Sequence, residues 1–262
     1  MSAPVPAIDR AVRVLYLFKN GDKKEYGVSE ISRLLRLNKS TVHNILNTLT
    51  QHKFLEQNDT TRGYRLGPAL AELGSLVRSR LDVREVARPY LRRLMERTNA
   101  TCLLGAFDGK AITIIDKEEP MADVRVAASI GMKIPFCAGA FGQAFLAYLP
   151  PETVDPLLVN PGLKAFTPTS ITDPDQYRLA LATVQKRGYA LDDNEEYLRG
   201  VEAIAVPIFV PGLDSGDKEV TAVMTLVGFS SQLSAEKMSE FIPWLVESGQ
   251  EISEKLGFAG RQ

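Results

Sequence analysis

Residues 28–67 constrain the fold more than any other part of the sequence. Their pattern predicts two short amphipathic helices joined by a tight turn and followed by a hairpin. Ser29 is expected to cap the first helix, because its hydroxyl can accept a hydrogen bond from an amide of the first turn. The apolar residues of this helix recur at helical spacing and predict one buried face, formed by Ile31, Leu34 and Leu35.

The second helix, which Asn38 is placed to cap, combines an apolar stripe with a polar face that carries no acidic residue. The stripe has offsets of three, four and seven residues and consists of Val42, Ile45, Leu46 and Leu49. Hydroxyl, amide and imidazole groups on the polar face can bond the edges of bases, and a lysine at the helix start can reach a phosphate. The candidate DNA contacts are Lys39, Ser40, Thr41, His43, Asn44 and Asn47. Such a face is also compatible with plain solvation, and His43 alone fits an ordinary surface histidine.

The segment after the second helix predicts a hairpin of the kind called a wing. Two short runs with apolar residues, 54–57 and 64–66, flank a loop rich in Asn, Asp, Thr and Gly, which is a hairpin signal. Arg62 at the tip of this loop is expected to touch the DNA backbone or the adjacent minor groove. Upstream, a further helical stripe is expected to complete a three-helix core, and it consists of Ile8, Ala11, Val12, Leu15 and Phe18. The whole pattern predicts a winged helix-turn-helix that inserts its second helix into the major groove.

The charge of the chain is distributed unevenly. The 262 residues carry a formal net charge of −1. Residues 1–80 hold 13 Lys and Arg against 7 Asp and Glu, a net of +6, whereas the remainder holds 18 against 25, a net of −7. A basic front and an acidic back indicate a nucleic-acid-binding module joined to a second domain that avoids phosphate.

Other classes of function lack their motifs in this sequence. No apolar run is long enough to span a bilayer and no signal peptide is visible, so we expect a cytoplasmic protein. Cys102 and Cys137 make no disulfide framework. No nucleophile elbow, phosphate-binding loop or dinucleotide fingerprint is present. Because both histidines, His43 and His52, lie in the basic part, we expect no catalytic residue, no metal and no cofactor.

The remainder of the chain predicts an α+β domain in which helices cover a mainly antiparallel sheet. Gly67-Pro68 is expected to end the wing and to start a linker helix. A turn at residues 108–110 joins two strands, and a further strand is expected at residues 124–129. Longer apolar strands are expected at residues 201–210 and 219–229.

Several short motifs of the chain are typical of one known family. They are Asp9-Arg10-Ala11, Asn38-Lys39-Ser40-Thr41-Val42-His43, Tyr64-Arg65-Leu66-Gly67, Gly139-Ala140-Phe141-Gly142-Gln143-Ala144-Phe145-Leu146-Ala147 and Arg187-Gly188-Tyr189-Ala190-Leu191-Asp192-Asp193-Asn194-Glu195-Glu196. In these motifs the chain resembles the isocitrate-lyase-regulator (IclR) family of bacterial transcription factors. The resemblance runs from near residue 8 to about residue 256 and is most specific in the DNA-binding part.

The resemblance implies a winged helix-turn-helix in residues 1–67, a linker helix in residues 68–82 and a GAF-like effector and oligomerisation domain in residues 83–262. It also implies dimers that often pair into tetramers. In similar proteins a small organic molecule, commonly an acid, lies between the sheet and the helix after a glycine-rich loop, where backbone amides can bind a carboxylate. The positions that match the family's effector site are Gly139, Ala140, Phe141, Asp193, Val201, Ala203, Thr225 and Val227.

Two departures from the family's pattern change what this pocket is expected to hold. Ala203 and Val227 stand where some relatives have polar groups, and Phe141 replaces the usual small residue. Both departures favour a pocket that is more apolar or differently shaped, and a partly aromatic effector. Structural roles fit the same residues: Phe141 as core, Gly139 as a tight turn and Asp193 as a cap.

The sequence therefore predicts a ligand-responsive DNA-binding transcriptional regulator of a metabolic operon, with a catabolic operon as the first choice. Its expected partners are double-stranded operator DNA, a small organic or aromatic acid, and a second copy of itself, with a dimer of dimers as the larger assembly. Repression and activation both stay open. The alternative is a GAF-like small-molecule sensor or enzyme with an incidental helix-turn-helix.

Overall fold

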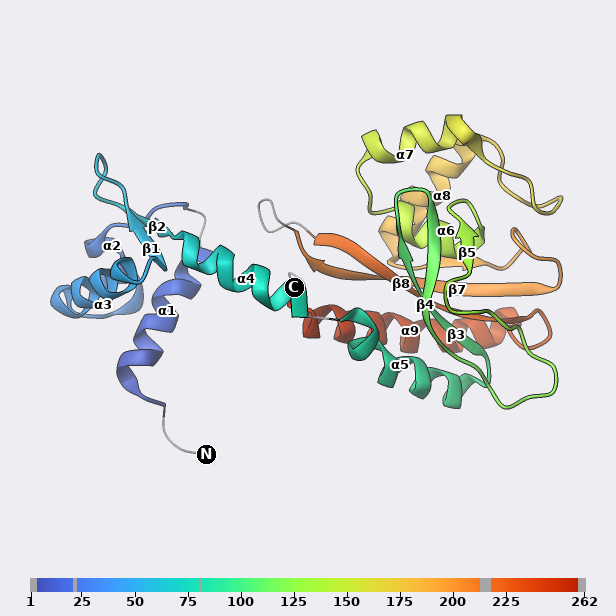
Figure 1. The fold of residues 1–262 in the computed structure, drawn as a ribbon, viewed down its shortest axis with the longest axis horizontal. Coiled ribbons are helices and arrows are strands. Elements are labelled where there is room, and N and C mark those ends of the chain that lie inside the picture. Colours follow the sequence, from blue (N-terminus) through green and yellow to red (C-terminus); the bar gives the residue numbers. More distant parts are fainter. Residues whose placement is uncertain (1–3, 21–22, 81, 213–217, 259–262) are drawn as a thin grey trace. The chain divides into compact units, whose positions relative to one another are not determined.

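The chain folds into two compact units, Met1–Arg80 and Leu81–Gln262. The computed structural model describes residues 4–20, 23–80, 82–212 and 218–258 (Figure 1). Each unit has a hydrophobic core of its own. The first unit holds the predicted winged helix-turn-helix and most of the predicted linker helix, of which Leu81 lies outside the described residues.

The first unit is a three-helix bundle with a two-stranded wing and one following helix. Its elements are α1 (Pro6–Asn20), α2 (Val28–Leu35), α3 (Lys39–Gln51), β1 (Leu55–Gln57), β2 (Tyr64–Leu66) and α4 (Pro68–Arg80). Fully buried Val14, Ile31, Val42 and Leu46 bring the three helices together. Tyr26 forms an antiparallel bridge with Tyr64, so the chain before α2 lies against the wing. The winged helix-turn-helix predicted from the sequence is confirmed.

The apolar face of α1 differs from the predicted one. Val14 is fully buried, whereas Ile8 is 62% and Val12 is 42% exposed. The same holds in α2, where Leu34 is 48% exposed beside buried Ile31. In so small a bundle each helix buries only its innermost side chains, and the neighbouring positions of the predicted stripe stay at the surface.

The start of α2 also differs from the prediction. The helix begins at Val28, and extended Gly27 is its N-cap, without a side-chain hydrogen bond. Ser29 therefore lies inside the first turn and does not cap it. The reason is the bridge at Tyr26, which keeps the chain extended up to Gly27, whose carbonyl then accepts from the amides of Glu30 and Ile31.

The second unit contains a six-stranded antiparallel sheet with the strand order β5-β4-β3-β8-β7-β6. The strands are β3 (Thr101–Phe107), β4 (Ala111–Glu118), β5 (Lys133–Pro135), β6 (Ala190–Asp192), β7 (Val201–Pro211) and β8 (Lys218–Phe229). The register places Leu103 opposite Thr225 and Gly105 opposite Val223. Alternation along β3 sends Leu103 and Gly105 to one face of the sheet, and Cys102 and Leu104 to the other.

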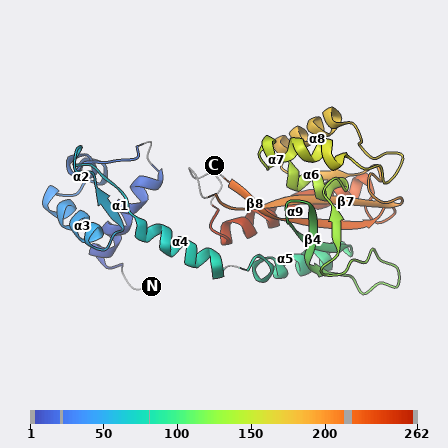
Figure 2. The ribbon, with the colours of Figure 1, turned by 45° about the horizontal axis from the view of Figure 1, so that its top comes forward.

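Helices cover both faces of this sheet (Figures 1 and 2). The helices are α5 (Val83–Thr98), α6 (Gly139–Leu146), α7 (Pro151–Leu157), α8 (Pro174–Arg187) and α9 (Ala235–Lys255), and α7 is followed by a kinked turn at Leu158–Gly162 in which Asn160 is non-helical. The two helices α5 and α9 pack over Cys102 and Leu104, and α6, α7 and α8 lie on the other face, over Leu103. The predicted α+β class, with a mainly antiparallel sheet covered by helices, is confirmed.

The strand predicted at residues 124–129 is wrong. This segment is irregular, and the strand that pairs with β4 is β5. Side chains satisfy its backbone in place of a neighbouring strand: Thr101 Oγ1 donates to the Val126 carbonyl at 2.6 Å, and the Ala128 amide donates to Glu119 Oε1 at 3.2 Å. The segment therefore crosses in front of the sheet and closes one side of a cavity described below.

Candidate nucleic-acid interface and ligand cavity

The polar face of α3 lies at the surface of the first unit. Lys39, Ser40, His43, Asn44 and Asn47 are exposed and Thr41 is half-exposed. No acidic residue occupies the first turn of the helix. The opposite face is anchored by the buried stripe, which fixes the orientation of the helix. The predicted contact residues therefore form one surface that is free of negative charge.

The N-terminus of α3 supports the same surface. Asn38 is the N-cap residue, but its side chain makes no capping hydrogen bond. The amides of the first turn keep the partial positive charge of a helix start, which favours a phosphate. Lys39 stands at this end and adds a full positive charge.

The wing is held by a residue that the sequence reasoning missed. Glu25 accepts hydrogen bonds from Asn58 Nδ2 at 2.9 Å and from Thr61 Oγ1 at 2.8 Å. These two bonds, the one from Asn58 above all, lower the pKa of the Glu25 carboxyl. Arg62 follows in a left-handed conformation with φ of 57° and an exposed side chain. Anchoring the loop to Glu25 leaves the Arg62 guanidinium at the wing tip without a protein partner among the described residues.

A partly enclosed cavity lies in the second unit between α6 and the sheet. A water-sized sphere can be centred in about 80 Å³ of it, and its empty space, including the part that opens to solvent, is about 590 Å³. The walls come from four regions: α6 and the loop before it, the strands β3, β5, β7 and β8, the irregular segment around Ala127, and the segment 192–198 that begins at the end of β6. Nearly all of the wall is apolar, and the polar exceptions are Asp192, Tyr197 and Thr225.

Six of the eight predicted effector-site residues line this cavity, and they are Ala140, Phe141, Val201, Ala203, Thr225 and Val227. The other two, Gly139 and Asp193, lie outside the lining. Asp193 is exposed and lies outside the lining, because β6 ends with Asp192 facing inward. Gly139 lies behind the wall, covered by the Asp192 carboxylate. Its φ is 47°, and a side chain at Gly139 would collide with Asp192 Oδ2.

Asp192 is the carboxylate that the sequence reasoning missed. It is 3% exposed, and its oxygens accept from the amides of Glu196 at 2.7 Å and Tyr197 at 3.2 Å. Burial raises the pKa of the Asp192 carboxyl, although these amide bonds oppose the shift. Burial, together with the charges of Asp192 and Asp193, also raises the pKa of Glu196 to about 7.

No basic side chain lines the cavity among the residues that the structure describes. Two basic residues from neighbouring segments are engaged in ion pairs: Lys133 pairs with Asp108 at 3.2 Å, and Arg125 pairs with Glu119 at 3.4 Å. Besides Asp192 and Tyr197, polar groups of two kinds lie at the wall. The amides of the first turn of α6 make no hydrogen bond to any described residue, and Thr225 Oγ1 is buried without a partner. The site can therefore hold an apolar body with one or two polar groups.

Metal and membrane sites receive no support from the described ranges. Within them, no three His, Cys, Asp or Glu side chains are arranged to hold a metal ion. None of the described helices is both long and apolar enough to cross a membrane.

The chain belongs to the IclR family of bacterial transcriptional regulators. The model of the IclR helix-turn-helix domain matches residues 7–59, and the model of the bacterial transcriptional regulator IclR C-terminal domain matches residues 76–254. It is accordingly a transcriptional regulator with a DNA-binding helix-turn-helix domain and a domain that binds small-molecule effectors.

Curated relatives and solved structures agree with this assignment. The chain is 32% identical over 254 residues to the HTH-type transcriptional regulator XynR of Escherichia coli (strain K12), covering 97% of this chain and 98% of that protein. An IclR-type regulator from Silicibacter sp. TM1040 superimposes with a TM-score of 0.80 at 28% identity, covering 98% of each chain. An IclR homologue from Microbacterium hydrocarbonoxydans, solved with 4-hydroxybenzoate, has a TM-score of 0.58 at 25% identity, covering 97% of this chain and 100% of the other.

Proposed function

We propose that this regulator binds operator DNA as a dimer through α3 and the wing, and that a small aromatic acid in the cavity changes its operator affinity. The observation that carries the proposal is the cavity, an apolar space with unpaired polar groups at its wall. The other unit exposes a face of α3 that has no acidic residue in its first turn. We also propose a metabolic, preferably catabolic, operon as its target and the cytoplasm as its place of action.

On the DNA side the proposed contacts are Lys39, Ser40, Thr41, His43, Asn44 and Asn47 in the major groove, with Arg62 at the phosphate backbone or minor groove. Their exposure and the absence of acidic neighbours on α3 support this assignment. Exposed apolar side chains on α1 and α4 support pairing of two copies: Ile8, Val12 and Leu73 are each at least 42% exposed. A dimer would present two recognition helices to the two halves of an operator.

On the ligand side, an aromatic ring fits the apolar wall, and the unpaired amides at the start of α6 are suited to a carboxylate. The Thr225 hydroxyl is placed to bond a second polar group. The homologue solved with 4-hydroxybenzoate makes a ring with a carboxylate and a hydroxyl a reasonable first probe. A coupling free energy of about 1–3 kcal/mol between the two sites would change operator affinity by roughly five- to more than a hundredfold.

A gel-shift titration with DNA from upstream of the protein's own gene tests the DNA half. Lys39→Ala and Thr41→Ala should each weaken binding with the fold intact. Lys186→Ala is the matched control, because it removes an exposed lysine from α8 in the other unit. Unchanged affinity in both α3 variants would leave the alternative, a GAF-like small-molecule sensor or enzyme whose helix-turn-helix is incidental.

The ligand half is tested by repeating the titration with 4-hydroxybenzoate and with phenol. Ala140→Leu places a larger side chain in the cavity and should abolish the response to either compound while DNA binding persists. Asp193→Ala, which removes an exposed carboxylate outside the cavity, is its control. A response that survives Ala140→Leu would place the effector elsewhere, and a response to phenol alone would rule out the acid.

A further inference from the structure

The ring of Phe141 takes up the space that a missing side chain leaves on the sheet. On β3, alternation brings Leu103 and Gly105 to the face under α6. A Cβ atom built on Gly105 would lie 2.9 Å from Phe141 Cζ and 2.6 Å from Ile112 Cγ2, closer than real Cβ atoms approach other atoms. The Phe141 ring therefore rests directly on the backbone of β3, and Gly105 is what lets it do so.

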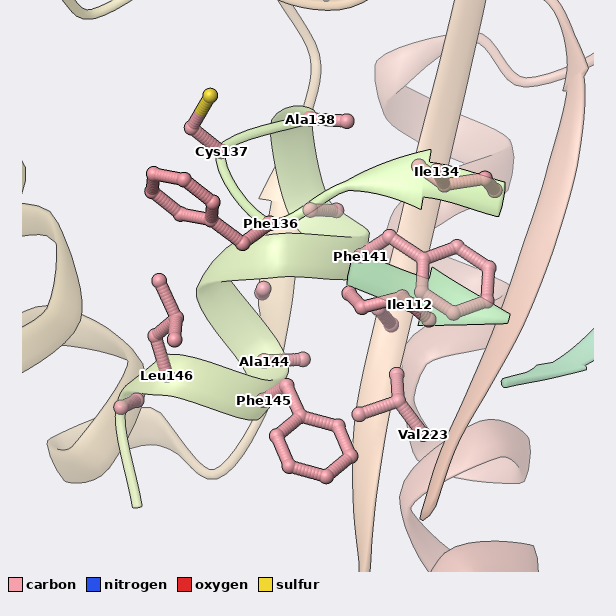
Figure 3. Close-up of a cluster of buried hydrophobic side chains, with 14 of the residues drawn as sticks. Ile112, Ile134, Phe136, Cys137, Ala138, Phe141, Ala144, Phe145, Leu146 and Val223 are labelled. Atoms are coloured by element: carbon pink, nitrogen blue, oxygen red, sulfur yellow. The ribbon is translucent and has the colours of Figure 1, made fainter. Parts of the chain in front are cut away.

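The ring of Phe141 is packed against buried residues on the sheet side and borders the cavity. In Figure 3 the ring of Phe141 points from α6 toward the sheet, beside Ile112 and Ile134, both of them buried. The helix packs closely on the loop before it, since Gly142 lies against the Phe136 carbonyl group, where a Cβ atom would collide. Phe141 also lines the cavity. A ring displaced from Gly105 thus moves into the cavity.

We infer that Phe141, seated on Gly105, sets the size of the ligand that the cavity accepts and limits it to a single ring. This inference rests on the proposal that the cavity is the effector site. Removing the ring extends the cavity by the volume of one aromatic ring, and apolar space of that kind takes up aromatic molecules. Adding a methyl group at Gly105 instead pushes the ring inward and shrinks the space.

Calorimetric titration of the full-length protein with phenol and 2-naphthol tests this size limit. Both probes are neutral and differ by one fused ring, so the result does not depend on a bound carboxylate. The wild type should bind phenol in preference to 2-naphthol. Phe141→Ala should bind 2-naphthol about tenfold more tightly than the wild type or better, because the added ring is buried in apolar surroundings. Gly105→Ala should weaken the binding of phenol.

Phe145→Ala is the matched control for this experiment. Phe145 lies on the same helix, is 4% exposed and packs on Phe107, with ring centroids 5.2 Å apart. Its ring points toward Val223 and does not line the cavity (Figure 3). Its removal should lower stability and leave the ratio of the two probe affinities as in the wild type.

A double-substitution cycle keeps the inference testable should Gly105→Ala fold poorly. Gly105→Ala should lower the melting temperature in the wild type, and by less in the Phe141→Ala background, where the clash with the ring is gone and only the one with Ile112 Cγ2 remains. An equal loss in both backgrounds, or the same probe ratio in Phe141→Ala as in the wild type, overturns the inference. If the wild type binds neither probe and Phe141→Ala binds one, the size limit stands and the proposed effector site of the wild type fails.

Discussion

The buried hydroxyl of Thr225 allows a direct measurement of the free-energy cost of an unpaired polar group in the cavity wall. Thr225 is 1% exposed, and its Oγ1 has no hydrogen-bond partner among the described residues. A buried polar group without a partner costs about 1–3 kcal/mol. Thr225→Val exchanges the hydroxyl for a methyl group of similar size, so it should raise the free energy of unfolding by about 1 kcal/mol. For a unit of this size that corresponds to a melting temperature about 2–4 °C higher.

Thr101 provides the comparison, because it is equally buried and belongs to the neighbouring strand. Its Oγ1 donates to the Val126 carbonyl at 2.6 Å. Thr101→Val leaves that carbonyl unsatisfied and should lower the free energy of unfolding by about 1–3 kcal/mol. The two substitutions are chemically identical, so their difference isolates the hydrogen bond.

Urea unfolding followed by tryptophan fluorescence is the suitable assay. The single tryptophan, Trp244, lies on α9, so the signal reports the second unit. A loss of stability in Thr225→Val as large as that in Thr101→Val would mean that the Thr225 hydroxyl already has a protein partner. The hydroxyl would then be unavailable to a ligand, and Thr225 could not supply the polar contact proposed for it in the cavity.

Three further predictions concern the wing, the acidic loop and α6. Arg62→Ala should weaken operator binding and reduce the slope of log affinity against log salt by about 1; an unchanged slope would remove the wing from the interface. Because the pKa of Glu196 is raised to about 7 in the folded protein, its contribution to stability is present below about pH 4.5 and is lost as the pH rises to about 7. Glu196→Gln should remove that fall, which we put at about 1–2 kcal/mol after allowing for solvent screening; parallel pH profiles of stability for wild type and variant would contradict it. Gly142→Ala should lower the free energy of unfolding by at least about 2 kcal/mol, because the new Cβ atom collides with Phe136. Gly74→Ala in α4 is its control: a Cβ atom there has no other atom within 4 Å, so the substitution should be neutral or stabilising by up to about 1 kcal/mol. Thermal unfolding measures both effects.

The first unit could be predicted from sequence because its pattern is local. The spacing of Val42 and Leu46 defines α3 without reference to distant residues, and the loop composition defines the wing. Local periodicity could not predict which residues of an apolar stripe stay exposed in a small bundle, as Ile8 and Val12 do. Nor could it give the bridge from Tyr26 to Tyr64, which joins residues 38 positions apart and moves the start of α2.

The cavity was harder to predict because its walls depend on tertiary contacts. Asp192 and Asp193 are adjacent, and a shift of one residue decides which of them faces inward. The signal was present in the alternation of β6, since Ala190 is buried and the second residue after it, Asp192, must share its face. The segment 124–129 has the composition of a strand, yet the side chains of Thr101 and Glu119 take its backbone hydrogen bonds.

The close approach of Gly142 to Phe136 has a consequence for how such a sensor can diverge. Helix α6 packs so closely on the loop before it that position 142 tolerates no side chain. Substitutions at that position therefore cannot shift the helix in small steps. Neighbouring Phe141 lines the cavity, so a smaller side chain at that position would leave more room inside it. Duplicated copies of such a gene could therefore acquire new chemical preferences by single exchanges at the wall, while the scaffold that carries the wall stays the same.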